Sequence, residues 1–282
     1  MDTSNKRKCV IPLVIIEDSG KSHRDYDFRA MVDHNVERLV RAIENSEHGS
    51  QVRLLSVHYN DETSVKSRFA PVRNIRSGAL NLAECKGTAQ TGKAMLFAMD
   101  EMQRQREAWK AENTDFTRAV FLLLTDDRPV DWPLEQRDDM EAAYQKAALR
   151  VRALEAEGQH TIAGCALSQL RMIRCNEKKL QEMCKETFVV RQMPDGMEHM
   201  EEGFSDVIAW VKHAIANAWA DRPRPERVKP RPEPAPEPTP EPAPEPAPGP
   251  APEPKPGPAP GPAPDDPILR FLGILDEGGR RS

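Results

Sequence analysis

The sequence predicts an α/β protein, a three-layer, doubly wound domain with a mostly parallel sheet, followed by a proline-rich tail. Short continuous apolar runs alternate with longer segments of helical spacing along residues 9–220. This alternation is typical of parallel strands joined by crossover helices. In addition, 21 of the 26 prolines lie between Pro223 and Pro267, so the end of the chain cannot contribute to a core.

Five apolar runs have the length and continuity of central strands that are covered on both faces. They are residues 10–16, 52–59, 119–124, 161–167 and 187–190. A more polar segment, 65–75, is predicted as an edge strand.

Five segments between these runs place their apolar residues on one side of a helix. They are residues 28–43, 91–109, 138–157, 176–186 and 204–219. In a doubly wound sheet, the ligand site lies at the carboxyl ends of the strands, where the strand order reverses. Site residues are therefore expected directly after the strands.

Composition excludes several classes of protein. No run of 18 apolar residues is present, so no membrane span is predicted. The net charge of −5 and the 5% content of aromatic residues argue against a nucleic-acid binder. The five cysteines form no CxxC pair, which predicts free thiols and a cytoplasmic location.

The chain divides into four parts by composition. We expect a flexible N-terminus at 1–8, a folded domain at 9–221, a proline-rich linker at 222–264 and a docking peptide at 265–282. Every second residue from Pro230 to Pro264 is proline, which favours an extended polyproline II spacer. A ligand for a proline-binding module is the alternative interpretation of the linker.

The segment after the linker is apolar again. Its apolar residues are Ile268, Leu269, Phe271, Leu272, Ile274 and Leu275. These residues are too few to form a core, and a hydrophobic peptide on a long tether is typical of a docking motif. We expect this peptide to bind a second protein partner, with docking onto its own domain as the alternative.

Three motifs occur in order along the chain. The first strand ends in Glu-Asp-Ser-Gly-Lys-Ser at 17–22, a helix opens at Thr91, and the third apolar run ends in Thr-Asp-Asp-Arg-Pro-Val-Asp-Trp at 125–132. Together they resemble a von Willebrand factor A domain, most closely the bacterial tellurium-resistance-type group. The stretch 204–215 resembles the final helix of that family, and the resemblance covers residues 9–220.

The resemblance implies a metal-ion-dependent adhesion site. In such a site, hydroxyls and aspartates hold Mg²⁺, and an open position accepts a carboxylate from a partner protein. Glu17, Ser19, Thr91 and Asp126 match the ligand positions. Lys21 stands where a second serine is expected, and an ammonium offers no lone pair and repels a cation. We therefore expect a degenerate site without metal, Mg²⁺ or Mn²⁺ being the ions that it would otherwise hold.

Two other arrangements of these residues remain open. Lys21 could occupy the place of the metal and pair with Glu17 and Asp126. A register shifted by one residue uses Asp18 and Ser22 as ligands, but Gly20 then replaces a hydroxyl.

The other motifs are weaker, and the seven histidines, which show no paired metal spacing, are interpreted as surface or packing residues.

We expect a non-enzymatic adaptor of a bacterial stress-response or defence system. One protein partner would bind at the strand-end loops and a second at the C-terminal peptide, with no nucleic acid involved. The alternatives are a scaffold subunit of a larger complex and a metal-dependent hydrolase that uses Glu17 and Asp126.

Overall fold

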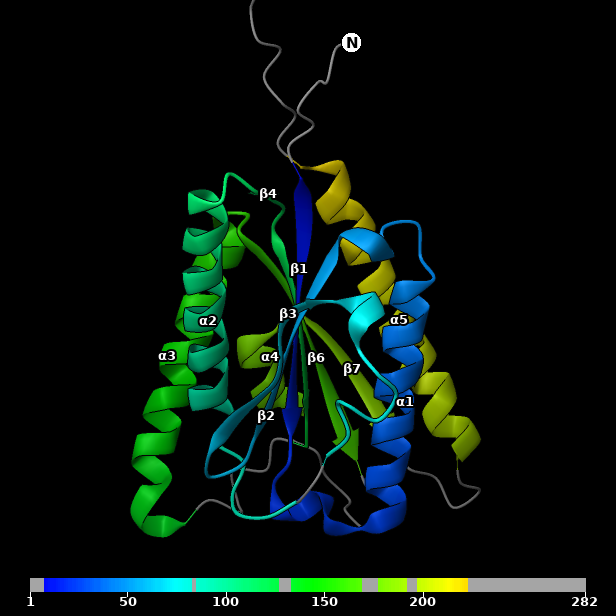
Figure 1. Ribbon diagram of the computed structural model, residues 1–282. Coiled ribbons are helices and arrows are strands. Elements are labelled where there is room, and N and C mark those ends of the chain that lie inside the picture. Colours follow the sequence, from blue (N-terminus) through cyan, green and yellow to red (C-terminus); the bar gives the residue numbers. More distant parts are fainter. Residues whose placement is uncertain (1–7, 83–84, 127–132, 169–176, 192–196, 223–282) are drawn as a thin grey trace, which may run out of the picture. The chain divides into compact units, whose positions relative to one another are not determined.

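The computed structural model of the protein (Figure 1) describes residues 8–82, 85–126, 133–168, 177–191 and 197–222. It contains a central, mostly parallel sheet with helices on both sides, which confirms the predicted three-layer fold. The expected linker and docking peptide lie outside the described residues, and their boundaries stay predictions. Within the described ranges, no helix is both long and apolar enough to cross a membrane.

The sheet has the strand order β3-β2-β1-β5-β6-β7, and β4 pairs with the beginning of β1. The strands are β1 (Cys9–Asp18), β2 (Val52–Tyr59), β3 (Thr63–Pro71), β4 (Asp115–Phe116), β5 (Ala119–Thr125), β6 (His160–Ser168) and β7 (Glu186–Arg191). All neighbouring strands are parallel except β2 and β3. The chain moves outward from β1 first to β2 and later to β5, so the order reverses between β1 and β5.

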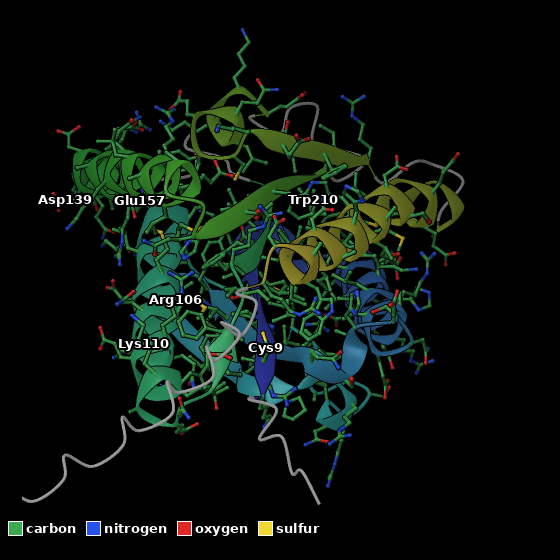
Figure 2. All side chains as sticks on the ribbon, turned by 90° about the horizontal axis from the view of Figure 1, so that it is seen from above. Cys9, Arg106, Lys110, Asp139, Glu157 and Trp210 are labelled. Carbon is green, nitrogen blue, oxygen red and sulfur yellow. The ribbon has the colours of Figure 1, made fainter. Side chains whose placement is uncertain are left out.

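The helices form the two outer layers. They are α1 (Tyr26–Glu44), α2 (Thr91–Ala111), α3 (Arg137–Ala156), α4 (Glu177–Met183) and α5 (Met197–Ala220). Figure 2, seen from above, shows α2 with Arg106 and α3 with Asp139 on one side of the sheet, and α5 with Trp210 on the other. Helix α1 lies beside α5 on that second side.

The continuous apolar run of β1 follows from this layering. Ile11, Leu13 and Ile15 pack in the core under α1 and α5. Val14 and Ile16 point to the opposite face and pack in the core under α2, α3 and α4. Because both faces of the strand are covered, the run shows no polar alternation.

Several elements differ from their predicted form. Residues 187–190 lie in an edge strand, β7, rather than in a central one, and only Val190 in that strand is buried. The strand contains apolar residues because α5 covers one of its faces, where the rings of Phe188 and Trp210 pack edge to face. Helix α5 begins earlier than predicted, α4 ends sooner, and the two-residue β4 was not predicted.

The cysteines that the structure describes carry free thiols. They are Cys9, Cys85, Cys165 and Cys184. The fifth, Cys175, lies outside the described residues. Burial raises the pKa of the Cys85 thiol to about 11, so this thiol stays protonated at neutral pH.

Candidate functional site

The site at the strand ends is built around Asp18, the last residue of β1. Its side chain is fully buried. One carboxylate oxygen accepts a hydrogen bond from the Gly20 backbone N–H at 2.7 Å. The other accepts one from the Thr125 hydroxyl at 3.0 Å, and Thr125 is the last residue of β5. These bonds fix the carboxylate at the point where the strand order reverses.

The hydroxyls of Ser19 and Thr91 are both present at this end of the sheet, and both contact Tyr59. The backbone N–H and the hydroxyl of Ser19 donate to the carbonyl oxygen of Tyr59, at 2.7 and 2.9 Å. The Thr91 hydroxyl, at the first residue of α2, lies 3.2 Å from the phenolic oxygen of Tyr59. Both residues are buried, and each hydroxyl is engaged by Tyr59.

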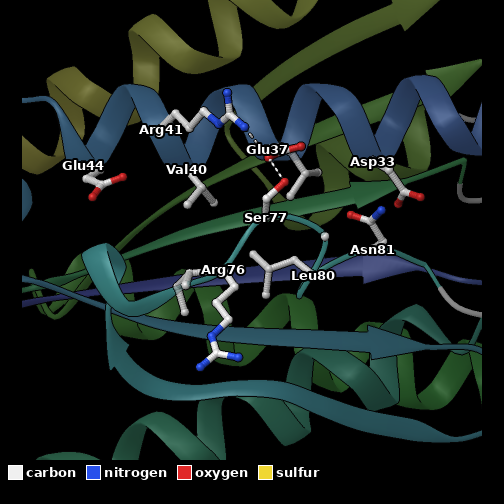
Figure 3. Close-up of a pocket in the computed structure, with 12 residues that line it drawn as sticks. Asp33, Glu37, Val40, Arg41, Glu44, Arg76, Ser77, Leu80 and Asn81 are labelled. Carbon is white, nitrogen blue, oxygen red and sulfur yellow. Dashed lines mark hydrogen bonds and ion pairs between the residues drawn. The ribbon is translucent and has the colours of Figure 1, made fainter.

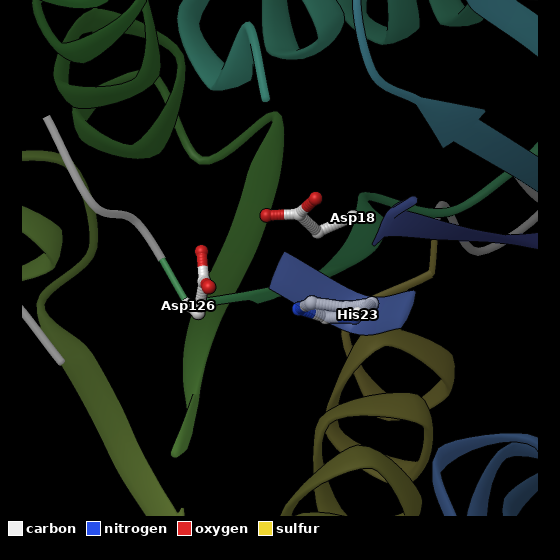
Figure 4. Close-up of side chains that lie close together, drawn as sticks. All are labelled: Asp18, His23 and Asp126. Carbon is white, nitrogen blue, oxygen red and sulfur yellow. The ribbon is translucent and has the colours of Figure 1, made fainter. Parts of the chain in front are cut away.

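Asp126 follows β5 and lies next to Asp18 and His23 (Figure 4). One ligand atom from each of these three residues lies within 4.8 Å of the others. His23 belongs to a short 3-10 helix, η1 (Lys21–Arg24), that directly follows the first strand. Asp18 and Asp126 are thus brought together as the shifted register requires.

The structure places Glu17 away from this cluster, which corrects its predicted role as a ligand. In a strand, neighbouring residues point to opposite faces, and Glu17 lies on the face covered by α1 and α5. It is in register with His58 of β2, whose Nε2 lies 3.6 Å from the Glu17 carboxylate. Glu17 therefore does not belong to the group formed by Asp18, His23 and Asp126. The alternative of a metal-dependent hydrolase that uses Glu17 and Asp126 stays a prediction.

Glu17 and His58 are both buried, and burial favours the neutral form of each. Desolvation raises the pKa of Glu17 well above its ordinary value, and nearby Asp33 raises it further. Desolvation lowers the pKa of His58 to about 3, with Lys66 acting in the same direction. His58 is consequently neutral at neutral pH, and burial favours the protonated form of Glu17, although the geometry of the two side chains is that of an ion pair.

The side chain of Lys21 is exposed, which corrects the arrangement in which its ammonium replaces the metal. Its backbone N–H donates to the carbonyl oxygen of Gly87 at 3.0 Å and holds the turn in place. The turn therefore points the ammonium to solvent, while the carboxylates of Asp18 and Asp126 are buried.

The assembled residues do not form the hydroxyl-rich magnesium site that the resemblance implies. The second serine position holds Lys21 in one register, and the first holds Gly20 in the other. An imidazole, His23, stands beside the two carboxylates instead. From the sequence, this histidine is interpreted as a surface or packing residue, and the only signal available was its place in the turn after β1.

A separate cavity of about 180 Å³ lies along α1 (Figure 3). It is lined by Asp33, Val36, Glu37, Val40, Arg41, Glu44, Ile75, Arg76, Ser77, Gly78, Leu80 and Asn81. The Glu37 carboxylate accepts hydrogen bonds from Ser77 and Arg41, and these bonds lower the pKa of Glu37. This cavity contains none of the residues predicted for the site.

Comparisons with known proteins agree with this fold. A family model described as von Willebrand factor type A domain matches residues 13–185, which is more than half of the chain. A comparison with curated proteins finds no match.

Solved structures with the same fold include three at low sequence identity. The vWF domain of the type V pili tip protein Mfa5 from Porphyromonas gingivalis is 9% identical over 74% of this chain and 97% of that chain, with a TM-score of 0.51. The pilus adhesin SpaC from Lactobacillus rhamnosus GG is 10% identical over 75% of this chain and 31% of that chain, with a TM-score of 0.53. Proximal thread matrix protein 1 from the mussel byssus is 14% identical over 74% of this chain and 47% of that chain, with a TM-score of 0.51. This chain spans less than half the length of the last two, and these likenesses show the fold alone.

Proposed function

Because the chain belongs to the von Willebrand factor type A domain family, we propose that it is a non-enzymatic module that binds a partner protein at its strand ends. Domains of this family mediate protein–protein interactions. The observation that carries the proposal is that Asp18, Ser19, Thr91 and Asp126 are all buried polar residues at the end of the sheet where the strand order reverses. Buried polar residues at that position are costly to fold and are typical of a binding site.

The finer proposal is an adaptor with two binding ends in a bacterial stress-response or defence system. Its support is the motif order that resembles the tellurium-resistance-type group, together with the composition of the tail. The proline-rich linker would separate the domain from the peptide 268–275, which would bind the second partner. A cytoplasmic location and the absence of catalytic activity belong to the same proposal.

A pair of charge reversals tests the strand-end surface. Lys21 is exposed in the turn after β1, and Lys110 is exposed in the last turn of α2, at the opposite end of that helix from Thr91. Cross-linking and capture from a bacterial lysate should yield a partner with the wild type and with Lys110→Glu, but not with Lys21→Glu. Equal capture by the two variants would contradict binding at the strand ends.

A truncation after Asp221 tests the second end. Loss of one partner and retention of the other would support the two-ended adaptor. Unchanged partners would remove the docking role of the peptide. Loss of every partner, with the domain still folded, would favour a scaffold subunit that is anchored by its tail.

A further inference from the structure

A buried imidazole stands beside two carboxylates at the ends of β1 and β5. Asp18, His23 and Asp126 are at most 6% exposed, and their ligand atoms lie within 4.8 Å of one another. From this geometry we infer that the three residues bind a divalent ion of the Zn²⁺ type rather than Mg²⁺. The inference deepens the proposed function, because such an ion would lie on the face proposed to bind the partner.

The state of His23 is the observation that points to a ligand. Its side chain is 0% exposed, and neither ring nitrogen has a hydrogen-bond partner in the part of the chain that the structure describes. The ring packs edge to face on Phe28 with centroids 5.2 Å apart, a contact that satisfies neither nitrogen. A buried polar group without a partner is costly, and coordination of a metal removes that cost.

The surroundings of Asp18 are those of a positioned metal ligand. Gly20 and Thr125 each donate one hydrogen bond to a different carboxylate oxygen, so the group cannot rotate freely. Each oxygen keeps a further lone pair for a cation. Outer hydrogen bonds of this kind orient metal ligands and contribute to affinity.

The distances are compatible with a small ion after a modest movement of the side chains. Zinc binds imidazole nitrogen and carboxylate oxygen at about 2.0–2.2 Å, which separates tetrahedral ligand atoms by about 3.3–3.5 Å. The ligand atoms of the three residues lie within 4.8 Å of one another. Side-chain rotations that move these atoms by about 1 Å would bring them to the separations that zinc requires. Three protein ligands leave a fourth position for water or for a group from a partner.

The type of donor atom selects the ion. Magnesium requires near-octahedral coordination by oxygen. Imidazole nitrogen suits zinc and the related transition metals. In either register one position where the resemblance implies a hydroxyl has no side-chain oxygen, because Lys21 or Gly20 occupies it. The turn that lacks this hydroxyl is also the segment that supplies His23.

Calorimetric titration of the purified full-length chain tests the inference. We expect a single Zn²⁺ per chain and at least tenfold weaker binding of Mg²⁺. His23→Phe keeps an aromatic ring against Phe28 but removes both nitrogens, and it should weaken zinc binding by at least ~100-fold. Asp126→Asn should also weaken it. His213→Ala removes an exposed histidine and should leave the affinity unchanged.

Three results would overturn the inference. One is the lack of stoichiometric zinc binding by the wild type. Another is zinc binding that survives His23→Phe or is lost in His213→Ala. The third is magnesium binding as tight as that of zinc. Circular dichroism of the metal-free variants confirms that each compared protein is folded.

Cobalt substitution of the wild type provides a measurement that does not depend on the variants. Intense visible d–d absorption is expected from four-coordinate Co²⁺, and a weak octahedral spectrum would contradict the site. Both measurements use the chain alone. Failure of the metal site is therefore distinguishable from failure to capture a partner.

Discussion

Glu17 and His58 form a buried pair whose protonation makes stability depend on pH. Because burial raises the pKa of Glu17, the folded state keeps the carboxyl proton at pH values where the unfolded chain has lost it. Glu17 therefore lowers the free energy of unfolding as the pH rises above about 4.5. His58 acts oppositely: its folded pKa of about 3 lies below the ordinary 6.5, so it adds stability between these values as the pH rises.

Glu17→Gln should remove the destabilisation at higher pH. Between about pH 4.5 and 6.5, Glu17 and His58 change the free energy of unfolding in opposite directions as the pH rises. Above that range, only Glu17 makes this free energy depend on pH. As the pH rises, the free energy of unfolding of the variant should increase relative to that of the wild type by up to about 1.4 kcal/mol per pH unit. The increase ends where the Glu17 carboxyl ionises in the folded wild type. Urea unfolding between about pH 5 and 8 measures this difference. Glu47→Gln, at an exposed position, serves as the control, and parallel profiles for Glu17→Gln and the wild type would mean that Glu17 is charged in the fold.

The residue scale also shows the limit of the sequence at the site. Asp126 directly follows β5 and Thr91 begins α2, so their positions could be read from clearly patterned elements, while their role as ligands stays a prediction. Glu17 and Asp18 are adjacent, and only the pleat of β1 decides which of them faces the site. His23 lies in a turn, where no periodicity reports burial.

At the scale of elements, the close packing of α2 on α3 positions Thr91. A Cβ atom on Gly92 would lie 2.4 Å from the backbone nitrogen of Tyr144 and 2.5 Å from its Cα. Because those are backbone atoms, the clash can be relieved only by moving a helix. The glycine therefore lets the beginning of α2 approach α3 and fixes Thr91 beside Tyr59.

Gly92→Ala should destabilise the domain by about 2–3 kcal/mol through overpacking. The measurement is urea unfolding followed by circular dichroism. Gly158→Ala provides a comparison, because nothing lies within 4 Å of its added Cβ, and only its φ of 66° opposes alanine. That change should cost about 1 kcal/mol. Equal losses for the two variants would show that α2 does not depend on Gly92 for its approach.

Arg106 joins α2 to the segment that leads into β6. Its guanidinium donates to the side-chain oxygen of Gln159 and to the Gln159 carbonyl oxygen, each at 2.6 Å. It also lies over the ring of Phe116, with 5.8 Å to the centroid. Burial lowers the pKa of Arg106, because desolvation disfavours the charged guanidinium. The contacts with Gln159 and Phe116 offset this cost of burying the charge.

Arg106→Ala should cost about 2–3 kcal/mol, because it leaves the Gln159 acceptors without their charged donor and removes packing. Arg104→Ala is the matched control on the same helix. Arg104 is 62% exposed and pairs with the buried Glu101. Because Glu101 keeps its ion pair with Arg68 at 2.7 Å, the loss of Arg104 should change stability by less than about 1 kcal/mol. Thermal unfolding of both variants compares the buried guanidinium of Arg106 with the exposed one of Arg104. If Arg106→Ala were as stable as the wild type, the contact between Arg106 and Gln159 would have no structural role.

At the scale of the whole molecule, the hydrophobic core lies on the two faces of one sheet. Its residues in the described part of the chain run from Val10 to Ala218. The composition after Arg222 is rich in proline and cannot form a second core. We therefore expect the stability of the domain to depend on the residues before the proline-rich segment, and the binding of the second partner to depend on the residues after it.

Removal of residues 223–282 should leave the free energy of unfolding of the domain within about 0.5 kcal/mol of its full-length value. Chemical unfolding of the full-length and truncated proteins provides the comparison. A large loss of stability would mean that the peptide 268–275 packs on the domain, which is the alternative to docking on a partner.

The sequence by itself determined the three-layer architecture and the end of the sheet that carries the site. Continuous apolar runs between amphipathic segments have few other ways to bury their surface. Only the tertiary structure decided that β7 lies at the edge, that Asp18 rather than Glu17 faces Asp126, and that His23 is buried beside them. Those outcomes depend on the pleat, on sheet order and on contacts between distant segments, and a local sequence pattern records none of these.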